Sequence, residues 1–116
     1  MGYTKEIMRA GGQPGIAGAR PTLGSKVTVH CTGYGKNNDL SQKFWGTKDD
    51  GQKPFTFTIG KGQVIKGWDE GVLTMAVGEI ARITCTPEYA YGASGFPAWG
   101  ILPNSTLMFE IELLSV

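Results

Sequence analysis

Few side chains in this chain of 116 residues could carry acid, base or nucleophilic chemistry. It has one histidine, His30, and two cysteines, Cys31 and Cys85. His30 and Cys31 are neighbours in a segment that alternates apolar and polar residues. In a β-strand their side chains would point to opposite faces, so they could not form a catalytic dyad. We therefore interpret His30 as a surface or strand-packing residue.

Metal, carboxylate and phosphate chemistry have equally little support. A zinc site needs three or four convergent ligands, and one histidine with two distant cysteines does not supply them. The acidic pairs Asp69-Glu70 and Asp49-Asp50 are adjacent in sequence, so their carboxylates diverge. The glycine-rich segment Gly60-Lys61-Gly62 lacks the rest of a Walker motif. We expect neither a metal nor a cofactor.

The chain is instead rich in aromatic rings, with five phenylalanines, four tyrosines and three tryptophans. Most of them should be core residues in a domain of this size. The apolar cluster Phe96-Pro97-Ala98-Trp99, however, falls in a loop, where it needs a ligand or a packing partner. An aromatic cleft with few titratable groups is typical of a site for an uncharged, apolar ligand.

One reaction can proceed in such a cleft without an acid, a base, a nucleophile or a metal. Rotation about an X–Pro amide crosses a barrier of about 18–20 kcal/mol because resonance stabilises the planar amide. The twisted transition state is less polar at its carbonyl, so a dry aromatic pocket binds it better than the planar ground state. Prolyl isomerisation is thus one use of such a cleft, and simple binding of an apolar ligand is another.

Alternating apolar and polar residues predict the strands that must position these rings. Residues 26–32 place Val27, Val29 and Cys31 on one face. Further strands are expected near residues 3–8, over 79–86 and over 106–114. Another strand starts at residues 43–45, is interrupted by the charged turn 48–51, and resumes with strict alternation over 55–59. This interruption predicts a split or bulged edge strand.

A single helix is expected between the two β-rich halves. Its apolar positions are Ile65, Trp68, Val72 and Met75, spaced three and four residues apart, and Gly78 is the stop signal. One helix of about three turns can cover only one face of a sheet. We therefore predict a single α+β domain over residues 1–116, in which a five-stranded, antiparallel, twisted sheet forms a half-barrel around one short α-helix.

The composition limits the partners of this domain. The net charge of +1 gives no electrostatic footprint for nucleic acid or for anionic membranes. No apolar run approaches the roughly 18 residues of a membrane span. The first residues include Lys5, Glu6 and Arg9 instead of an apolar signal core, so we expect a cytoplasmic protein.

Two motifs give a closer assignment. The segment Val64-Ile65-Lys66-Gly67-Trp68-Asp69-Glu70-Gly71-Val72 and the later Tyr89-Ala90-Tyr91-Gly92 together resemble the FKBP-type peptidyl-prolyl isomerases, which are small single-domain enzymes that also bind immunosuppressive macrolides. The resemblance covers residues 25–116. It implies an isomerase acting on prolyl peptides and proteins, with rapamycin and tacrolimus as expected ligands.

The resemblance also implies roles for individual residues. Trp68 matches the floor of the prolyl pocket, the backbone N–H of Ile65 matches the group that binds a ligand carbonyl, and Tyr91 matches the hydroxyl that bonds the substrate. With Phe109, these three residues make up the expected catalytic set. The expected binding set is Phe44, Phe55, Val64, Ile65, Trp68, Tyr91, Phe96, Ile101 and Phe109.

Three features depart from the family pattern. Trp45 stands where an acidic residue usually follows the first pocket phenylalanine, which removes a carboxylate that often bonds macrolides. Cys31 stands where many members have a pocket tyrosine. One extra residue falls within 48–53 and another near residues 98–99. These extra residues and Trp45 together resemble the plant and algal branch of the family.

The residues leave several alternatives open. Strand parity places Cys31 and Cys85 on the inward face, where they form either two reduced thiols or a redox-controlled disulfide; a bond requires Cα atoms within about 7 Å. Trp45 and Cys31 also favour a second functional hypothesis, a catalytically weak module of the same fold that binds macrolides or proteins. The protein is expected to be mostly monomeric, and docking of the Phe96-Pro97 loop into a second copy would give weak self-association.

Overall fold

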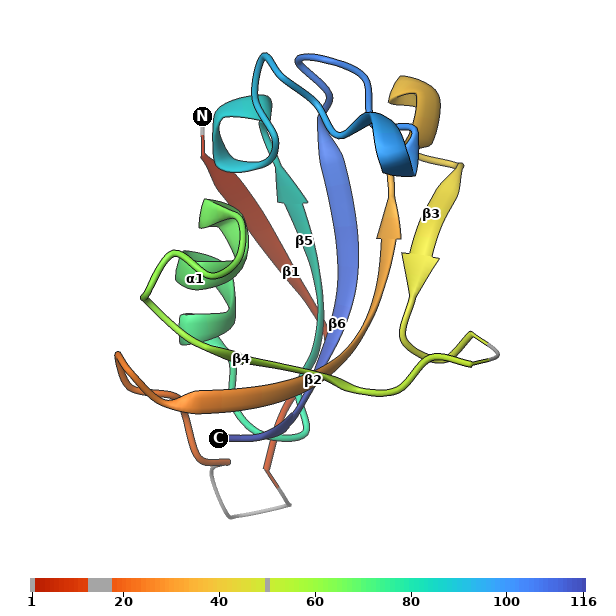
Figure 1. The fold of residues 1–116 in the computed structure, drawn as a ribbon. Helices are drawn as coiled ribbons and strands as arrows, with labels where there is room; N and C mark the ends of the chain where they lie inside the picture. Colours follow the sequence, from red (N-terminus) through yellow and green to blue (C-terminus); the bar gives the residue numbers. More distant parts are fainter. Residues whose placement is uncertain (1, 13–17, 50) are drawn as a thin grey trace.

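The computed structural model describes residues 2–12, 18–49 and 51–116, which form one curved sheet and one α-helix (Figure 1). The α-helix is α1 (Lys66–Gly71), and the 3₁₀ helix Val72–Thr74 continues it. Other 3₁₀ helices are Lys36–Asn38, Pro87–Tyr89 and Pro97–Trp99. The strands are β1 (Tyr3–Arg9), β2 (Lys26–Tyr34), β3 (Lys43–Gly46), β4 (Phe55–Thr58), β5 (Ile80–Cys85) and β6 (Leu107–Ser115).

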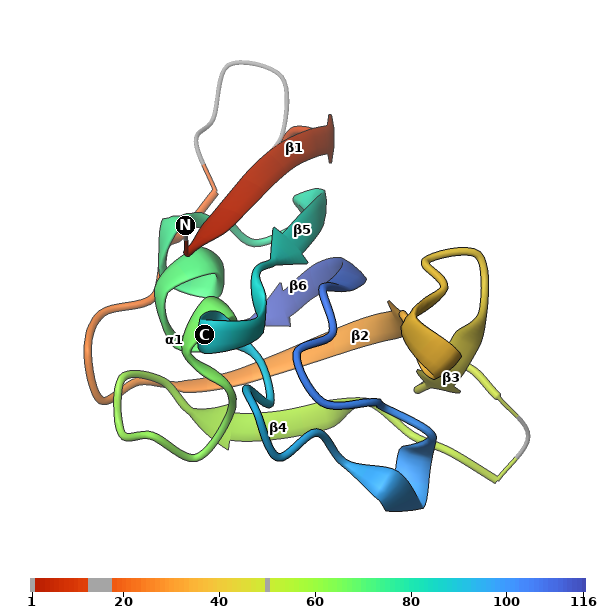
Figure 2. The same cartoon turned by 90° about the horizontal axis from the view of Figure 1, so that it is seen from above.

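All the strands belong to one antiparallel sheet with the order β1-β5-β6-β2-β3, in which β4 also pairs with β2. One half of β2 pairs with β4 and the other half pairs with β3. The split edge strand predicted from the sequence is therefore confirmed, because six strands fill five positions in the sheet. Residue 50 of the expected turn lies outside the described residues. The sheet curves around α1 from β1 to β4 and remains open (Figure 2).

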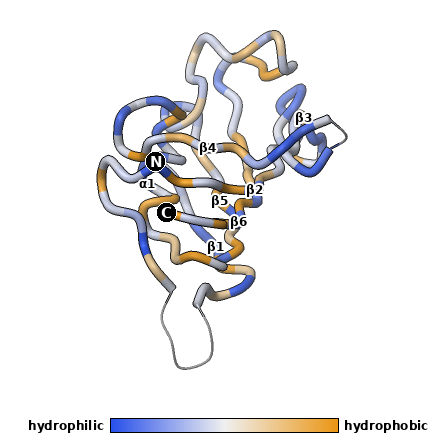
Figure 3. The backbone as a smooth tube through the Cα atoms, turned by 60° about the horizontal axis from the view of Figure 1, so that its bottom comes forward, coloured by the Kyte–Doolittle hydropathy of each residue, from blue (hydrophilic) through white to orange (hydrophobic). Residues whose placement is uncertain are grey.

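Alternation along the strands decides which side chains enter the core. Val27, Val29 and Cys31 of β2 are buried, whereas the residues between them remain partly accessible. Ala81, Ile83 and Cys85 of β5 are also fully buried, with partly accessible residues between them. Hydrophobic and hydrophilic positions accordingly alternate along the central strands, while the turns next to β3 are mostly hydrophilic (Figure 3). The inward faces predicted for these strands are confirmed.

The α-helix is shorter than the apolar spacing predicted. In place of a helix over residues 65–75, α1 has six residues and then tightens into the 3₁₀ helix. The chain becomes extended at Met75, with φ −89° and ψ 155°, before it reaches Gly78. Trp68, Val72 and Met75 are nevertheless buried, as the spacing predicted. No helix in the described part of the chain is long and apolar enough to cross a membrane.

Two glycines allow α1 to lie close to β5. A Cβ atom at Gly67 would overlap the Sγ atom of Cys85, and a Cβ atom at Gly71 would lie 2.9 Å from Cδ1 of Ile83. Glycine lowers helix propensity by roughly 1 kcal/mol per residue. The two glycines therefore weaken a helix that is already interrupted after one and a half turns. In return, they allow the close packing of α1 on β5 that positions Trp68.

Candidate functional site

An apolar cavity of about 280 Å³ opens between α1, the β3–β4 edge and the segment that follows β5. None of the side chains around it carries a charge, so the cavity suits an uncharged, apolar ligand. The wall contains six aromatic rings, two aliphatic side chains and one amide, from Trp45, Phe55, Gln63, Val64, Ile65, Trp68, Tyr91, Trp99 and Phe109.

Trp68 forms the floor of this cavity. Its side chain extends from the buried face of α1 and is 3% exposed. The rings of Phe55 and Phe109 meet the indole edge-to-face, with centroids 5.9 and 5.3 Å away, and Trp45 stacks on it at 6.2 Å. The buried Nε1 atom has no hydrogen-bond partner among the described residues. Packing against its neighbours, and no hydrogen bond from the described residues, therefore fixes the orientation of the indole.

Two uncharged hydrogen-bond donors belong to residues of the cavity wall. Ile65 precedes α1 with φ −60° and ψ 154°, and within the described residues its N–H forms no backbone hydrogen bond. Burial raises the pKa of the Tyr91 hydroxyl, so this group stays protonated at neutral pH and remains a donor. Both donors can orient the carbonyl groups of a ligand without bringing a charge into the apolar cavity.

The structure brings six of the nine residues of the expected binding set to the cavity wall. Three of them, Val64, Ile65 and Trp68, come from the first motif and lie at the start of α1. The other three come from β4, from the segment after β5 and from β6, and they are Phe55, Tyr91 and Phe109. Residues that are far apart in sequence thus converge on one cavity.

Phe44, Phe96 and Ile101 do not line the cavity, although the resemblance placed them at its wall. Phe44 stacks on Trp99 with a centroid distance of 5.6 Å. Phe96 stacks on Tyr91 at 5.4 Å with an interplanar angle of 17°, and Ile101 is a core residue with 2% exposure. Phe44 and Phe96 thus pack on the wall residues Trp99 and Tyr91, and the expected binding role of all three residues stays a prediction.

Trp45 lines the cavity because β3 contains a bulge. Gly33 pairs with Trp45 and Tyr34 pairs with Lys43, so Phe44 is an extra residue in β3. A bulge interrupts the alternation of a strand, which allows two successive aromatic side chains to pack on the same side. From the sequence, Trp45 was expected to remove a carboxylate and was not placed in the binding set, whereas its indole is part of the wall in the structure.

Trp99 and Gln63 are the other wall residues absent from the expected binding set. Trp99 stacks on Trp45 at 5.7 Å with an interplanar angle of 14°, and it meets Phe96 edge-to-face at 4.8 Å. The apolar loop cluster was the sequence signal for Trp99, since those rings needed a packing partner. The signal for Gln63 was only its position next to Val64.

The two cysteines are free, buried thiols in the structure. Cys31 lies on β2 and Cys85 on β5, and strand β6 separates these two strands. Burial raises the pKa of the Cys85 thiol to about 12 and also raises the pKa of Cys31. The disulfide that the sequence had left open is therefore not formed in the structure, which corresponds to the reduced alternative.

We expect both thiols to be unreactive in the folded protein. At pH 8 an alkylating reagent should modify neither thiol without denaturant and both in denaturant without a reductant; recovery of no thiols would instead indicate a disulfide.

The raised thiol pKa also makes stability depend on pH. Because the pKa of Cys85 in the folded protein lies above the ordinary value of 9.0, the contribution of the protonated thiol to the free energy of unfolding is complete below pH 9 and is lost as pH rises towards 12. Above pH 9 the free energy of unfolding should fall by about 1.4 kcal/mol per pH unit for each thiol. Urea unfolding of the wild type and of Cys85→Ala, which removes one contribution, measures this slope.

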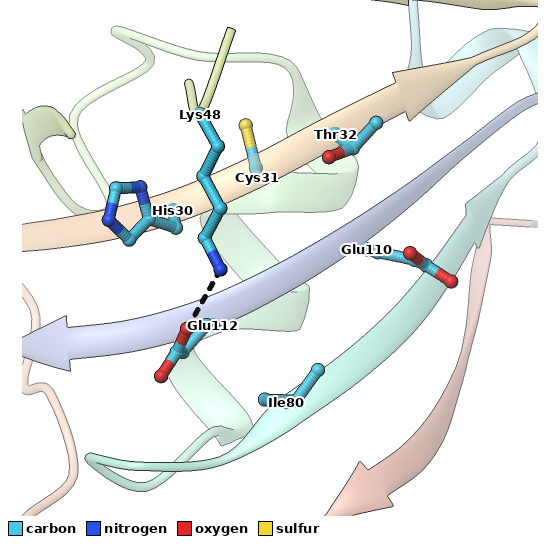
Figure 4. Close-up of a pocket in the computed structure, with 7 residues that line it drawn as sticks. All are labelled: His30, Cys31, Thr32, Lys48, Ile80, Glu110 and Glu112. Atoms are coloured by element: carbon cyan, nitrogen blue, oxygen red, sulfur yellow. Dashed lines mark ion pairs between the residues drawn. The ribbon is translucent and has the colours of Figure 1, made fainter. Parts of the chain in front are cut away.

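A second cavity, of about 220 Å³, lies on the sheet face opposite α1 (Figure 4). Its carboxylates already have cationic partners. Glu112 pairs with Arg9 at 3.2 Å and with Lys48 at 3.9 Å, and Glu110 pairs with Arg82 at 2.9 Å. The residues that line it are His30, Cys31, Thr32, Lys48, Ile80, Glu110 and Glu112.

His30, which lines this second cavity, has a structural partner next to it. Its Nδ1 atom lies 2.9 Å from Oγ1 of Thr47, and the same hydroxyl oxygen accepts a hydrogen bond from the N–H of Cys31. Thr47 thereby attaches the segment after β3 to β2. This arrangement agrees with the interpretation of His30 as a strand-packing residue, and in the described residues no three metal-ligating side chains form a group.

A family model and several known proteins match this chain over most of its length. Residues 18–114 match the model of the family described as FKBP-type peptidyl-prolyl cis-trans isomerase. The chain is 68% identical to peptidyl-prolyl cis-trans isomerase FKBP12 of Vicia faba, over 98% of this chain and 97% of that protein. It is 65% identical to the Arabidopsis thaliana protein of the same name, over 100% and 99%. It is 50% identical to FK506-binding protein 1 of Saccharomyces cerevisiae, over 89% and 86%.

The family model and the relatives cover the elements that build the cavity, from β2 through α1 to β6. Two of the three relatives are plant proteins, in agreement with the resemblance to the plant branch. The chain belongs to the FKBP-type peptidyl-prolyl cis-trans isomerases.

Proposed function

We propose that the cavity above Trp68 is where this isomerase binds prolyl peptides and accelerates rotation about the X–Pro bond. The single observation that supports this assignment most strongly is the cavity wall itself, with six aromatic rings and no charged side chain. The planar amide is stabilised by charge separation between nitrogen and oxygen, and the twisted amide has lost it. Removal from water therefore raises the energy of the planar form more than that of the twisted form.

The two donors of the wall orient the peptide during this rotation. We assign to the Ile65 N–H a hydrogen bond with one carbonyl of the substrate, and to the Tyr91 hydroxyl a second hydrogen bond. Trp68, which the ring of Phe109 meets edge-to-face at a centroid distance of 5.3 Å, supports the proline ring. The protein thus supplies shape, dryness and two fixed donors, and no proton or electron is transferred.

The same cavity is our proposed site for FK506-type macrolides. A relative at 50% identity is named FK506-binding protein 1, and the wall suits a large apolar ligand. Trp45 offers such a ligand an indole face in place of a carboxylate, so binding depends more on apolar contact and less on hydrogen bonds. We place the protein in the cytoplasm, where a reducing environment maintains free thiols such as Cys31 and Cys85.

Catalysed isomerisation of a Phe-Pro or Leu-Pro tetrapeptide tests these assignments. The uncatalysed reaction takes tens of seconds or longer at 25 °C, so acceleration is easily measured. We expect acceleration that FK506 or rapamycin abolishes in a dose-dependent manner. Acceleration that neither macrolide inhibits would refute the shared site, and the absence of acceleration would identify a catalytically weak binding module.

A further inference from the structure

Asp69 connects helix α1 to the loop that leads into it. Its Oδ1 atom accepts a hydrogen bond from the Gly60 N–H at 2.9 Å, and its Oδ2 atom accepts one from the Gly62 N–H at 2.9 Å. Hydrogen bonds to an ionised carboxylate are roughly twice as strong as those between neutral groups. Both oxygens of this side chain are thus bonded to the backbone of the loop.

The conformation of the loop depends on these hydrogen bonds. Gly60 and Gly62 have φ values of 80° and 72°, in the left-handed region that favours glycine. Residues 60–63 are exposed, so apolar packing contributes little to holding them. The amide oxygen of Gln63 accepts one more hydrogen bond, from the Thr58 N–H at 2.9 Å. Polar contacts, chiefly those of Asp69, therefore fix the position of the last residues of the loop.

The last residue of this loop and the two residues after it form the rim of the cavity. These residues, 63–65, line the cavity. The carbonyl of Ile65 then accepts hydrogen bonds from the N–H groups of Trp68 at 3.0 Å and Asp69 at 3.2 Å. Asp69 thus restrains Ile65 from both sides, through its carboxylate on the preceding loop and through its N–H on the carbonyl of Ile65.

We propose that Asp69 is a positioning residue for the isomerase reaction. Its carboxylate fixes the segment from Gly60 to Ile65, so that the free Ile65 N–H is aimed at the substrate carbonyl before the peptide binds. Asp69 does not line the cavity and acts only through this segment. The inference rests on the role proposed above for the Ile65 N–H. It adds Asp69, which would affect the reaction through the conformation of the segment from Gly60 to Ile65.

The test compares Asp69→Ala with a matched variant of the next residue, Glu70→Ala. Glu70 is exposed and lies outside the cavity wall. For a Phe-Pro tetrapeptide we expect kcat/KM to fall about tenfold in Asp69→Ala and to change less than about twofold in Glu70→Ala. FK506 affinity should fall in parallel with kcat/KM. Amide hydrogen exchange at Gly60 and Gly62 should become faster only in the Asp69 variant, and circular dichroism should confirm that both variants are folded.

Asp69→Asn provides a second variant in case alanine prevents folding. Asparagine retains one acceptor oxygen but turns an N–H₂ group towards the other glycine N–H, so kcat/KM should lie between those of wild type and Asp69→Ala. A general loss of stability would lower the unfolding midpoint without changing kcat/KM of the folded protein. Unchanged kcat/KM in both folded Asp69 variants overturns the proposal.

Ile65→Pro separates this inference from the function on which it rests. Proline removes the N–H and is compatible with φ −60° at this position. If Ile65→Pro lowers kcat/KM while the Asp69 variants do not, Ile65 belongs to the site and Asp69 does not position it. If Ile65→Pro retains full activity, the proposed role of the N–H is wrong, and the role of Asp69 is overturned with it.

Discussion

Replacing Trp68 by leucine should lower kcat/KM for a Phe-Pro tetrapeptide about 100-fold, which corresponds to about 2.7 kcal/mol of transition-state stabilisation. The indole is the floor of the cavity and is held by the rings of Phe55, Phe109 and Trp45. Leucine would leave part of that floor open to water, and the flat surface under the proline ring would be lost. Water in the cavity would stabilise the planar, more polar amide and so raise the barrier.

The control for this substitution is Phe57→Leu. Phe57 is buried and its ring lies 5.8 Å from that of Trp68, but it does not line the cavity. Both substitutions shorten a buried aromatic side chain and should destabilise the protein by about 2–4 kcal/mol. Urea unfolding gives the stability of each variant, and activity is compared where both are folded. Equal kcat/KM in the two variants would show that the floor assignment of Trp68 is wrong.

Replacing Gly67 by alanine should destabilise the fold by about 3 kcal/mol, which is at the upper end of the usual cost of overpacking. The new Cβ atom would overlap Sγ of Cys85 and would lie 3.3 Å from the carbonyl oxygen of Tyr89. The sulfur is buried and cannot move into solvent, so α1 must move away from β5. Because Trp68 is the next residue, the displacement should also lower kcat/KM in the molecules that remain folded.

Two further variants identify the cause of this destabilisation. Adding Cys85→Ala removes the overlapping sulfur, so the double variant should be more stable than the sum of the two single effects predicts, by at least about 1 kcal/mol. In Gly71→Ala of the same helix, only Cδ1 at the end of the Ile83 side chain, at 2.9 Å, is closer to the new Cβ atom than ordinary contact, and the higher helix propensity of alanine offsets part of the strain. Its free energy of unfolding should therefore change by less than about 1 kcal/mol. Additive effects of Gly67→Ala and Cys85→Ala would contradict the proposed overlap.

Much of the fold could be predicted from alternation and spacing along the sequence. The inward face of β2, with Val27, Val29 and Cys31, followed from the period of two that a strand imposes. The buried positions Trp68, Val72 and Met75 followed from helical spacing. Both patterns are local, because a few consecutive residues decide which side chains share a face. The length of α1 was not predictable in this way, since a 3₁₀ turn preserves nearly the same buried stripe.

The cavity was predictable only in part. Residues in the two motifs, such as Val64, Trp68 and Tyr91, were placed through the resemblance and do line it. Trp45 was missed because the bulge at Phe44 interrupts strand alternation, and no local sequence pattern predicts an extra residue of this kind. Trp99 was recognised as an aromatic ring in need of a partner, but nothing in the sequence identified Trp45 as that partner.

The sequence by itself determined the family, the open antiparallel sheet with one short helix, and the apolar character of the site. Those properties depend on residue type and on spacing within short segments. Only the tertiary structure decided which rings form the wall, how close α1 lies to β5, and that the Asp69 carboxylate reaches Gly60 and Gly62. These features depend on distances between elements, which are set when the sheet curves around α1 and all the side chains pack at once.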